Sequence, residues 1–459
     1  MNRKRKIFVL ILGIMMVVMG NILPLEGLSY QGRMCLSLTL MTVTFWAFQL
    51  VQSGYSAGLY LALLIILGVA SPEVVLSPWM GDTMYLVIGA YLIASAVKDS
   101  GLGERISYKF IIKFVDSYKS IIISIFVLTF ILTVIIPHPW PRAFLIMSVM
   151  ASLIEAANIP GEDSTKIGFT VFAATVPISM IFLTGDSVIN PIAAQASGKS
   201  IGWLEWLLYM GPPSIIASII TCILILLLFK PSREVNINKD SIRSKLDLLG
   251  PLSAREKKTM VWLALAVVLW LTDTVHGINI GWVTLLISML MAFPIIGDLL
   301  SLKHWGEVPV HVLLFLTAAM AIGKVGGVTG MNSWIAETIL PTTIPTNPYR
   351  LAIVIATISM GIHMVLGSVI AVMGIAIPTL LVFTESIGIN PIVTTLLVFS
   401  SISVHYLLPF HHLNILVGQG EENGGYGQKE VIRLGIPLTG LVFILVIIQI
   451  AYWKLIGLL

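Results

Sequence analysis

Charged and polar side chains interrupt the apolar sequence where a membrane helix would be expected to continue. Between residues 120 and 157, an apolar stretch long enough to cross a bilayer is broken by residues 137–142, which read PHPWPR. Three prolines prevent a continuous helix, and an arginine inside a membrane is costly unless it faces protein, water or an anion. The cluster therefore predicts a re-entrant hairpin, with His138 and Arg142 available at its tip to bind an anion.

The second half of the chain contains a similar pair of apolar arms. They span residues 350–387 and meet at Leu366-Gly367-Ser368. Two half-spanning hairpins predict a ligand site near the middle of the membrane, because irregular backbone is tolerated there only where protein or a cavity covers it. Helix N-termini at the two tips would present unpaired N–H groups and a partial positive charge to an anion.

Two further apolar stretches, residues 166–200 and 391–417, are interrupted by polar residues and are predicted to be broken helices. His411 and His412 lie in the second interruption, where imidazoles could add positive charge for an anion or carry a proton. Asp186 is the only acidic residue in either stretch. It could hold a cation or a proton inside the membrane.

These side chains also have structural explanations. Arg142 could pair with Glu155 or Asp186, or extend along the hairpin toward the membrane surface. His138 could be a hydrogen-bonded core histidine in a turn forced by prolines. Asp186 could cap a helix. The residue types alone leave both explanations open.

The composition sets the fold class. Of 459 residues, 57% are hydrophobic and only 11% are charged, compared with about 25% charged residues in soluble chains. Continuous apolar segments recur along almost the whole chain, whereas a β-barrel would show alternation. Cys35 and Cys222 lie in apolar segments without metal-ligand spacing. The sequence predicts an all-α polytopic membrane protein with about 11 transmembrane helices and two re-entrant hairpins.

The N-terminal segment, residues 1–34, begins with a basic cluster followed by an apolar run. A secretory signal has a similar start, but no small-residue cleavage pattern follows, so we expect this segment to remain as the first helix. Most of the 27 lysines and arginines fall in segments that this topology assigns to the cytoplasm. We therefore expect a multi-pass protein of the plasma or inner membrane, with a cytoplasmic N-terminus and an external C-terminus.

The chain also repeats itself around a basic central segment. The expected order of helix, amphipathic turn, hairpin, broken helix and helix occurs within residues 35–229 and again within 259–459, with residues 230–258 as a cytoplasmic linker. Residues 184–213 align with 408–437 at low identity. Because an odd number of expected crossings separates equivalent points, the second copy should be inverted, as in alternating-access carriers.

This arrangement resembles the divalent-anion/sodium symporters, which carry dicarboxylates, citrate or sulfate. The resemblance covers nearly the whole chain and depends on the order of several short segments. They are residues 89–94 (GAYLIA) with 100–106 (SGLGERI), 203–207 (WLEWL) with Gly211-Pro212-Pro213, and 408–414 (LPFHHLN) with Gly435-Ile436-Pro437. The resemblance implies a homodimer in which a hairpin-bearing transport domain slides against a scaffold.

In that family each hairpin tip usually carries Ser-Asn-Thr, which implies binding of sodium and substrate there. Here the first tip aligns with Pro137-His138-Pro139 and the second with Ser368-Val369-Ile370, so at least one sodium site is predicted to be weakened. The residues expected to contact the substrate are His138, Pro139, Arg142, Ser368, Val369, His411 and His412. Those expected to bind a coupling cation are Gly185, Asp186, Ser187, Asn190, Ser368 and Asn414.

The sequence thus predicts an elevator-type symporter of small divalent organic anions, with C4 dicarboxylates as the expected substrates and sodium or protons as the coupling ion. A carrier of sulfate or another inorganic anion is an alternative, and a channel or exchanger of arsenite or sodium/proton type is an alternative of another class. An enzyme is not expected, since no H-E-x-x-H or G-x-S-x-G pattern accompanies the histidines. The expected partners are the anion, the lipid bilayer and a second copy of the chain. We expect no nucleic acid, no cofactor and no metal beyond Na⁺.

Overall fold

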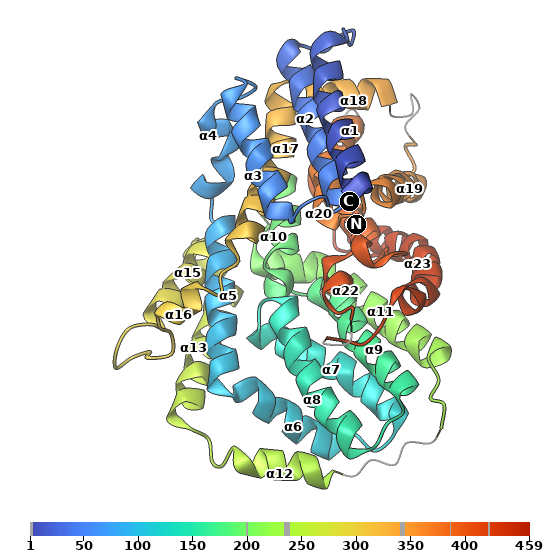
Figure 1. The fold of residues 1–459 in the computed structure, drawn as a ribbon. Coiled ribbons are helices and arrows are strands. Elements are labelled where there is room, and N and C mark those ends of the chain that lie inside the picture. Colours follow the sequence, from blue (N-terminus) through green and yellow to red (C-terminus); the bar gives the residue numbers. More distant parts are fainter. Residues whose placement is uncertain (1–2, 199–200, 234–238, 340–344, 386, 421–422) are drawn as a thin grey trace.

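The computed structural model describes residues 3–198, 201–233, 239–339, 345–385, 387–420 and 423–459. Throughout this described part the regular structure is helical, and a single isolated β-bridge joins Gln419 to Tyr426. The ribbon in Figure 1 shows how these helices are arranged. The expected all-α class is confirmed.

The N-terminal helices cover one side of the molecule. They are α1 (Arg3–Ile22), α2 (Tyr30–Ala47), α3 (Ser53–Ile66), α4 (Pro72–Val75) and η1 (Ser77–Met80). Helix α1 packs on α2, and most of its apolar side chains remain exposed, as expected for a lipid-facing helix. Helix α3 packs along α17 of the second half.

The first half continues with a kinked helix, a hairpin, a broken helix and a long helix. These elements are α5 (Thr83–Ser100), α6 (Leu102–Phe114), α7 (Tyr118–Ile135), α8 (Pro139–Ala156), α9 (Gly161–Ser179), η2 (Leu183–Asp186), α10 (Ile189–Ala196) and α11 (Trp203–Leu228). Helices α5 and α6 meet at an angle of 62°. Gly101 joins them with a φ of 79°, a left-handed conformation that favours glycine.

The first hairpin lies where the sequence predicts it. A capping box between Ser117 and Ser120 begins α7. The helix ends just before Pro137, and Pro139 occupies the first position of α8, where its missing N–H leaves no hydrogen bond unmade. The two arms therefore meet at a tip of only three residues, and each arm packs against α9.

The second half repeats this order. Its elements are α17 (Val310–Val328), α18 (Met331–Ile339), α19 (Pro348–Leu366), α20 (Val369–Glu385), α21 (Pro391–Ser403), η3 (Pro409–His411), α22 (Leu413–Val417) and α23 (Gln428–Leu455). Helix α19 ends at Gly367, whose φ is 62°. In Figure 1, α6 lies at the lower end of the molecule and its counterpart α18 at the upper end.

The central segment is more structured than a simple linker. It contains α12 (Asp240–Leu248), followed by α13 (Ala254–Leu271), α14 (Asp273–His276), α15 (Ile280–Leu290) and α16 (Leu302–Trp305). Helix α12 packs against α6 and α8, and Ile242 is fully buried there. Part of the expected linker, residues 234–238, lies outside the described residues. Amphipathic α12 thus covers the lower end of the first hairpin, which the charge pattern alone did not indicate (Figure 1).

Six described helices are individually long and apolar enough to cross a membrane, or seven if the kinked pair α5 and α6 is one span. The six are α1, α7, α11, α17 with the preceding turn, α19 and α23. Helices α3, α15, α20 and α21 are apolar but shorter. Of the six, α7 and α19 are arms of the hairpins. The other expected crossings correspond to α2, α3, α5, α13 and α15 and to the two broken helices.

Candidate functional site

A cavity of about 100 Å³ lies where both hairpins and both broken helices meet. Helices α5 and α17 and the start of α3 close its other sides. Its polar lining consists of Gln52, Ser53, Tyr91, His138, Trp140, Asp186, His311 and Asn414. Its apolar lining consists of Pro139, Val188, Ile189, Val312, Phe315, Ile370 and Leu413. We call this space the central cavity.

Helix N-termini point their partial positive charge at the central cavity. Pro139 is the first residue of α8, Ile189 is the first of α10, and Ile370 is the second of α20; all three line the cavity. The start of α10 is already neutralised, because Asp186 Oδ1 accepts hydrogen bonds from the N–H groups of Val188 and Ile189, at 3.0 and 3.1 Å. The start of α20 has no such carboxylate, so its N–H groups and dipole remain available to an anion. The start of α8 offers only its dipole, because Pro139 and Pro141 have no N–H and the N–H of Trp140 donates to His138 Nδ1.

One wall of the cavity is a chain of hydrogen bonds that orients an amide. His138 Nδ1 accepts from the N–H of Trp140 at 3.2 Å, so its Nε2 carries the proton and donates to Tyr91 Oη at 2.8 Å. Trp140 Nε1 in turn donates to Asn414 Oδ1 at 2.9 Å. Because Trp140 Nε1 can only donate, Asn414 must turn its carbonyl toward the indole. Asn414 Nδ2 is left buried with no acceptor in hydrogen-bond geometry; it interacts with the nearby Asp186 carboxylate and can also donate to an anion in the cavity.

Arg142 does not line the cavity. It is completely buried, and its guanidinium donates to three oxygen atoms of the first half. Nη1 donates to the carbonyls of Ile136 at 3.0 Å and Gly185 at 3.3 Å, and Nη2 donates to Ser179 Oγ at 2.6 Å and again to Gly185 at 3.3 Å. These carbonyls lie at the hairpin tip and in the break, where helical hydrogen bonds are missing. Arg142 makes no direct ion pair with Asp186 or Glu155, although its charge and that of Asp186 interact.

The first break also satisfies its other carbonyls internally. Asn190 Nδ2 donates to the carbonyls of Ser179 at 2.7 Å and Phe182 at 2.9 Å. The Gly185 carbonyl is occupied by Arg142, and a fixed guanidinium beside it opposes a metal ion at the same oxygen. Among the expected cation ligands in this break, Ser187 retains a buried hydroxyl without a partner.

Apart from Asn414, the expected residues of the second half do not line the cavity. Ser368 forms the hairpin tip and Val369 is the buried first residue of α20, but neither lines the cavity. His412 Nδ1 accepts from the N–H of Asn414 and so caps α22. His411 is fully buried and faces other histidines. Of the residues expected from the sequence, the structure brings His138, Pro139, Asp186 and Asn414 to the cavity and places the others behind it.

Several cavity residues were not predicted. Tyr91 lies within one of the segments that carry the family resemblance, yet a tyrosine in an apolar helix gave no separate signal. His311 begins α17, and Gln52 and Ser53 lie at the start of α3, far away in sequence. The close contact of Gly54 with His311 brings these helices together, since a Cβ at Gly54 would lie 2.6 Å from that of His311. Only the three-dimensional packing shows that the starts of α3 and α17 contribute side chains to the cavity.

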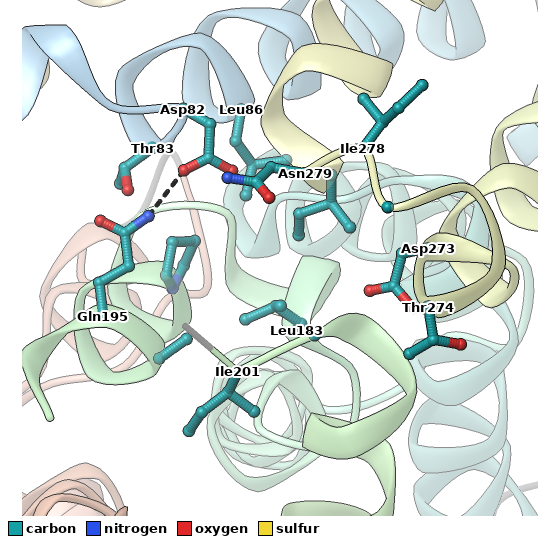
Figure 2. Close-up of a pocket in the computed structure, with 15 residues that line it drawn as sticks. Asp82, Thr83, Leu86, Leu183, Gln195, Ile201, Asp273, Thr274, Ile278 and Asn279 are labelled. Carbon is teal, nitrogen blue, oxygen red and sulfur yellow. Dashed lines mark hydrogen bonds between the residues drawn. The ribbon is translucent and has the colours of Figure 1, made fainter. Parts of the chain in front are cut away.

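A second polar cavity, of about 190 Å³, lies between α10 and the helices α5, α14 and α15. Figure 2 shows Gln195 reaching Asp82, with a hydrogen bond of 2.8 Å from Nε2 to Oδ1. Asp82 also accepts from the N–H of Gly281 in α15, and Asp273 accepts from the N–H of Trp203 at the start of α11. Both acids therefore cap neighbouring helices. The charged side chains among the described residues of its lining are the carboxylates of Asp82 and Asp273, which disfavour an anion.

The sequence was compared with known families and proteins. Residues 4–459 match the model of the family described as the sodium:sulfate symporter transmembrane region. The sodium-dependent dicarboxylate transporter SdcS of Staphylococcus saprophyticus is 22% identical over 87% of this chain and 82% of its own length. The chloroplastic dicarboxylate transporter 1 of Spinacia oleracea is 25% identical over 69% of this chain, which spans 57% of that protein.

A solved structure, the YdaH transporter of Alcanivorax borkumensis, aligns with a TM-score of 0.48 and 12% identity over 81% of this chain and 85% of that one. That likeness is too weak to support an argument about details. The family match, in contrast, extends over almost every residue. The chain is therefore a multi-pass membrane transporter and not an enzyme, and it belongs to the sodium:sulfate symporter family.

Proposed function

We propose that this protein is a secondary active carrier of a small divalent organic anion, with C4 dicarboxylates as its substrates. The observation that carries the proposal is the central cavity, where the N-termini of α8 and α20 converge on the unpartnered Asn414 Nδ2. The dipoles of both helices, the N–H groups at the start of α20 and the amide of Asn414 could together bind a carboxylate without a basic side chain. The relatives from Staphylococcus and spinach, whose names describe dicarboxylate transporters, support the same substrate class.

The size of the cavity supports a small substrate. About 100 Å³ is well below the roughly 300–1,000 Å³ of pockets that hold drug-sized ligands. A C4 dicarboxylate therefore suits the site better than citrate, which has a third carboxylate. Sulfate is the second candidate, since the same small cavity would also suit a compact inorganic dianion.

The transport mechanism that we propose is an elevator. The hairpins and broken helices would move as one body against α5, α17 and the N-terminal helices. The close contact between α17 and α20 supports such a sliding movement. A Cβ at Gly374 would lie 2.8 Å from the Ala319 carbonyl oxygen, and a Cβ at Gly323 would lie 3.3 Å from the Pro378 ring. Such close backbone contact leaves few interlocking side chains. The homodimer, the inverted relation of the two halves and the cytoplasmic N-terminus in the plasma or inner membrane belong to the same proposal.

The test of function is counterflow in proteoliposomes. Vesicles loaded with unlabelled succinate, sulfate or citrate should take up labelled succinate only when the internal anion is itself a substrate. We expect exchange with internal succinate and little with citrate, whereas a channel would show no stimulation by internal substrate. Asn414→Ala should reduce the exchange, and Asn423→Ala, a matched change in the later loop, should not. Absence of succinate counterflow together with rapid sulfate counterflow would replace the first candidate by the second.

A further inference from the structure

Three histidine side chains are gathered behind the second hairpin tip. His363 lies in the last turn of α19, and His405 and His411 lie in the break between α21 and α22. Their ring centroids are 5.1 to 5.9 Å apart, and all three are at most 1% exposed. We call them the histidine triad. Histidine pairs this close are hard to explain by apolar packing alone, because each ring carries a donor and an acceptor that burial leaves to be satisfied.

The hydrogen bonds fix the tautomers of the triad. His363 Nε2 lies 2.9 Å from the carbonyl oxygen of His411, which can only accept, so Nε2 carries the proton. In neutral His363 the other nitrogen, Nδ1, is then an acceptor. It lies 3.2 Å from His405 Nδ1, which must donate. His411 Nδ1 accepts from the N–H of Leu407, so its proton lies on Nε2, which has no partner.

This assignment leaves one basic nitrogen free in the triad, Nε2 of His405. A proton bound there makes His405 an imidazolium. Its Nδ1 proton can then pass along the 3.2 Å contact to Nδ1 of His363, so two rings share the single charge. Release of a proton from His405 restores the neutral arrangement. The geometry therefore provides for one exchangeable proton rather than three.

In each half of the chain a basic side chain of the hairpin bonds to a carbonyl of the adjacent break, from the second arm in the first half and from the first arm in the second half. In the first half, Arg142 of the hairpin donates to the Gly185 carbonyl of the adjacent break. In the second half, His363 of the hairpin donates to the His411 carbonyl of its own break. The first group is permanently charged and the second can gain or lose its charge. The first break thus holds a fixed cation, whereas the second holds a group whose charge can change during a transport cycle.

Few other titratable groups face the triad. In the same break, Tyr406 is buried with its hydroxyl unpartnered, and His412 caps α22. Of the helices packed against α19 and α21, α10 has no charged residue, and α2 and α20 carry charges only in their terminal turns. Helix α23 also carries Arg433 in its second turn, where the guanidinium lies over the Phe229 ring. On α8 and α9, which pack against α22, Arg142 is bonded to the first break and Lys166 is paired with Asp163. No described carboxylate bonds to the triad.

The triad is directly connected to the central cavity. Leu413 and Asn414, which line the cavity, follow His411 by two and three residues in the same break. The tip after α19 leads into α20, whose Ile370 also lines the cavity. A charge on the triad would thus lie one layer behind the anion site, in a region from which water is largely excluded. There it would attract a dianion strongly, and the dianion would favour protonation of the triad by the same amount.

We propose that the histidine triad binds the coupling proton, so that one proton is carried with each anion. This inference rests on the proposed function and specifies its coupling ion. Protonation at His405 when the site is open to the acidic side would prepare the cavity for the dianion. Deprotonation of His405 on the opposite side of the membrane would release the proton and the anion.

Proteoliposomes can separate coupling from transport. With sodium absent and the membrane potential clamped, a gradient of one pH unit can support at most about tenfold accumulation if one proton accompanies each anion. We expect succinate accumulation with acid outside in the unmodified protein. His405→Gln and His363→Gln should retain counterflow at saturating succinate but lose accumulation. His276→Gln, which alters a histidine that also donates to a carbonyl but lies at the end of α14, should behave like the unmodified protein.

Two transport results would overturn the proposal. One is undiminished pH-driven accumulation by His405→Gln, and the other is accumulation that follows an imposed sodium gradient and ignores pH. Failure of succinate and sulfate counterflow in the unmodified protein would instead contradict the proposed function. The protonation states of the triad would then be measured by nuclear magnetic resonance of isotope-labelled histidine in lipid nanodiscs. We expect a proton on His405 Nδ1, absent from His405→Gln, and one imidazolium shared by two rings on acidification. A proton on His405 Nε2 at neutral pH would refute the assignment.

Discussion

Arg142 joins the first hairpin to the first broken helix through the carbonyl oxygen of Gly185, to which both of its terminal nitrogens donate at 3.3 Å. The same guanidinium donates to the Ile136 carbonyl at the hairpin tip. A membrane interior offers little water to carbonyls released from helices, and here a single side chain satisfies two of them. The arginine that the sequence presents as an anion ligand is thus used to hold together the framework around the anion site.

The first prediction concerns this framework. Arg142→Gln should destabilise the protein by about 3–5 kcal/mol, because it removes one member of a buried charged network and leaves carbonyls without donors. Thermal unfolding in detergent measures the loss. Arg243→Gln is the matched control, since Arg243 is an exposed residue of α12 whose contact with Asp240 is 3.8 Å long. If Arg142→Gln had the melting temperature of the unmodified protein but failed to bind substrate, the arginine would be a ligand of the anion.

Asn414 should govern substrate affinity rather than stability. Asn414→Asp replaces the free N–H donor with a carboxylate next to Asp186, so we expect dianion binding to weaken by at least about tenfold, or 1.4 kcal/mol. Trp140→Phe removes only the donor that orients the amide, at 2.9 Å, and should weaken binding less. Equilibrium binding of labelled succinate to purified protein measures both effects. Equal affinity in all three proteins would mean that the anion binds elsewhere.

Gly367 should be the most sensitive position of the second hairpin tip. Its φ of 62° costs an L-residue about 1–2 kcal/mol, and a Cβ there would lie 2.7 Å from the Phe410 ring. Gly367→Ala should therefore lower stability and disturb the break that holds His411. Gly361→Ala on the same helix has open space around the new methyl group and should be neutral or slightly stabilising. Melting temperatures of the two variants, measured side by side, test this contrast.

Much of the fold could be predicted because prolines and glycines mark where apolar helices must stop. The hairpin expected at residues 120–157 corresponds to α7 and α8, and the one expected at 350–387 corresponds to α19 and α20, with each first arm beginning two residues earlier than expected. Pro137 and Gly367 locate the tips without reference to any distant part of the chain. The local sequence is therefore sufficient to predict where these hairpin helices end.

The site was harder to predict because side-chain direction depends on distant partners. Arg142 turns toward Gly185, 43 positions away, and His363 meets His405, 42 positions away. Nothing local distinguishes an arginine that faces a cavity from one that faces carbonyls of a neighbouring helix. Asn414 was predicted as a cation ligand, yet its carbonyl oxygen is held by Trp140 and its free nitrogen is a donor.

Stability should also depend on pH through a buried ion pair that lies at the start of α13, before its apolar stretch. Arg105 on α6 donates to Glu256 from Nε at 2.5 Å and from Nη2 at 3.1 Å, and it also donates to the carbonyls of Leu249 and Gly250. The hydrogen bonds from Arg105 lower the pKa of Glu256 below its usual 4.5. A carboxylate whose pKa is depressed by folding stabilises the folded state above the unfolded pKa and loses this contribution as the pH falls through the folded value.

We therefore expect the melting temperature to be insensitive to this group above about pH 4.5 and to fall below it, as Glu256 becomes protonated. Glu256→Gln should be less stable at neutral pH, by about 3–5 kcal/mol if Arg105 is left without its partner, and should show a flatter acid limb. Glu104→Gln, one residue from Arg105 on α6, controls for the loss of a carboxylate in the same region. Parallel acid limbs in the unmodified protein and Glu256→Gln would show that other carboxylates determine the acid sensitivity.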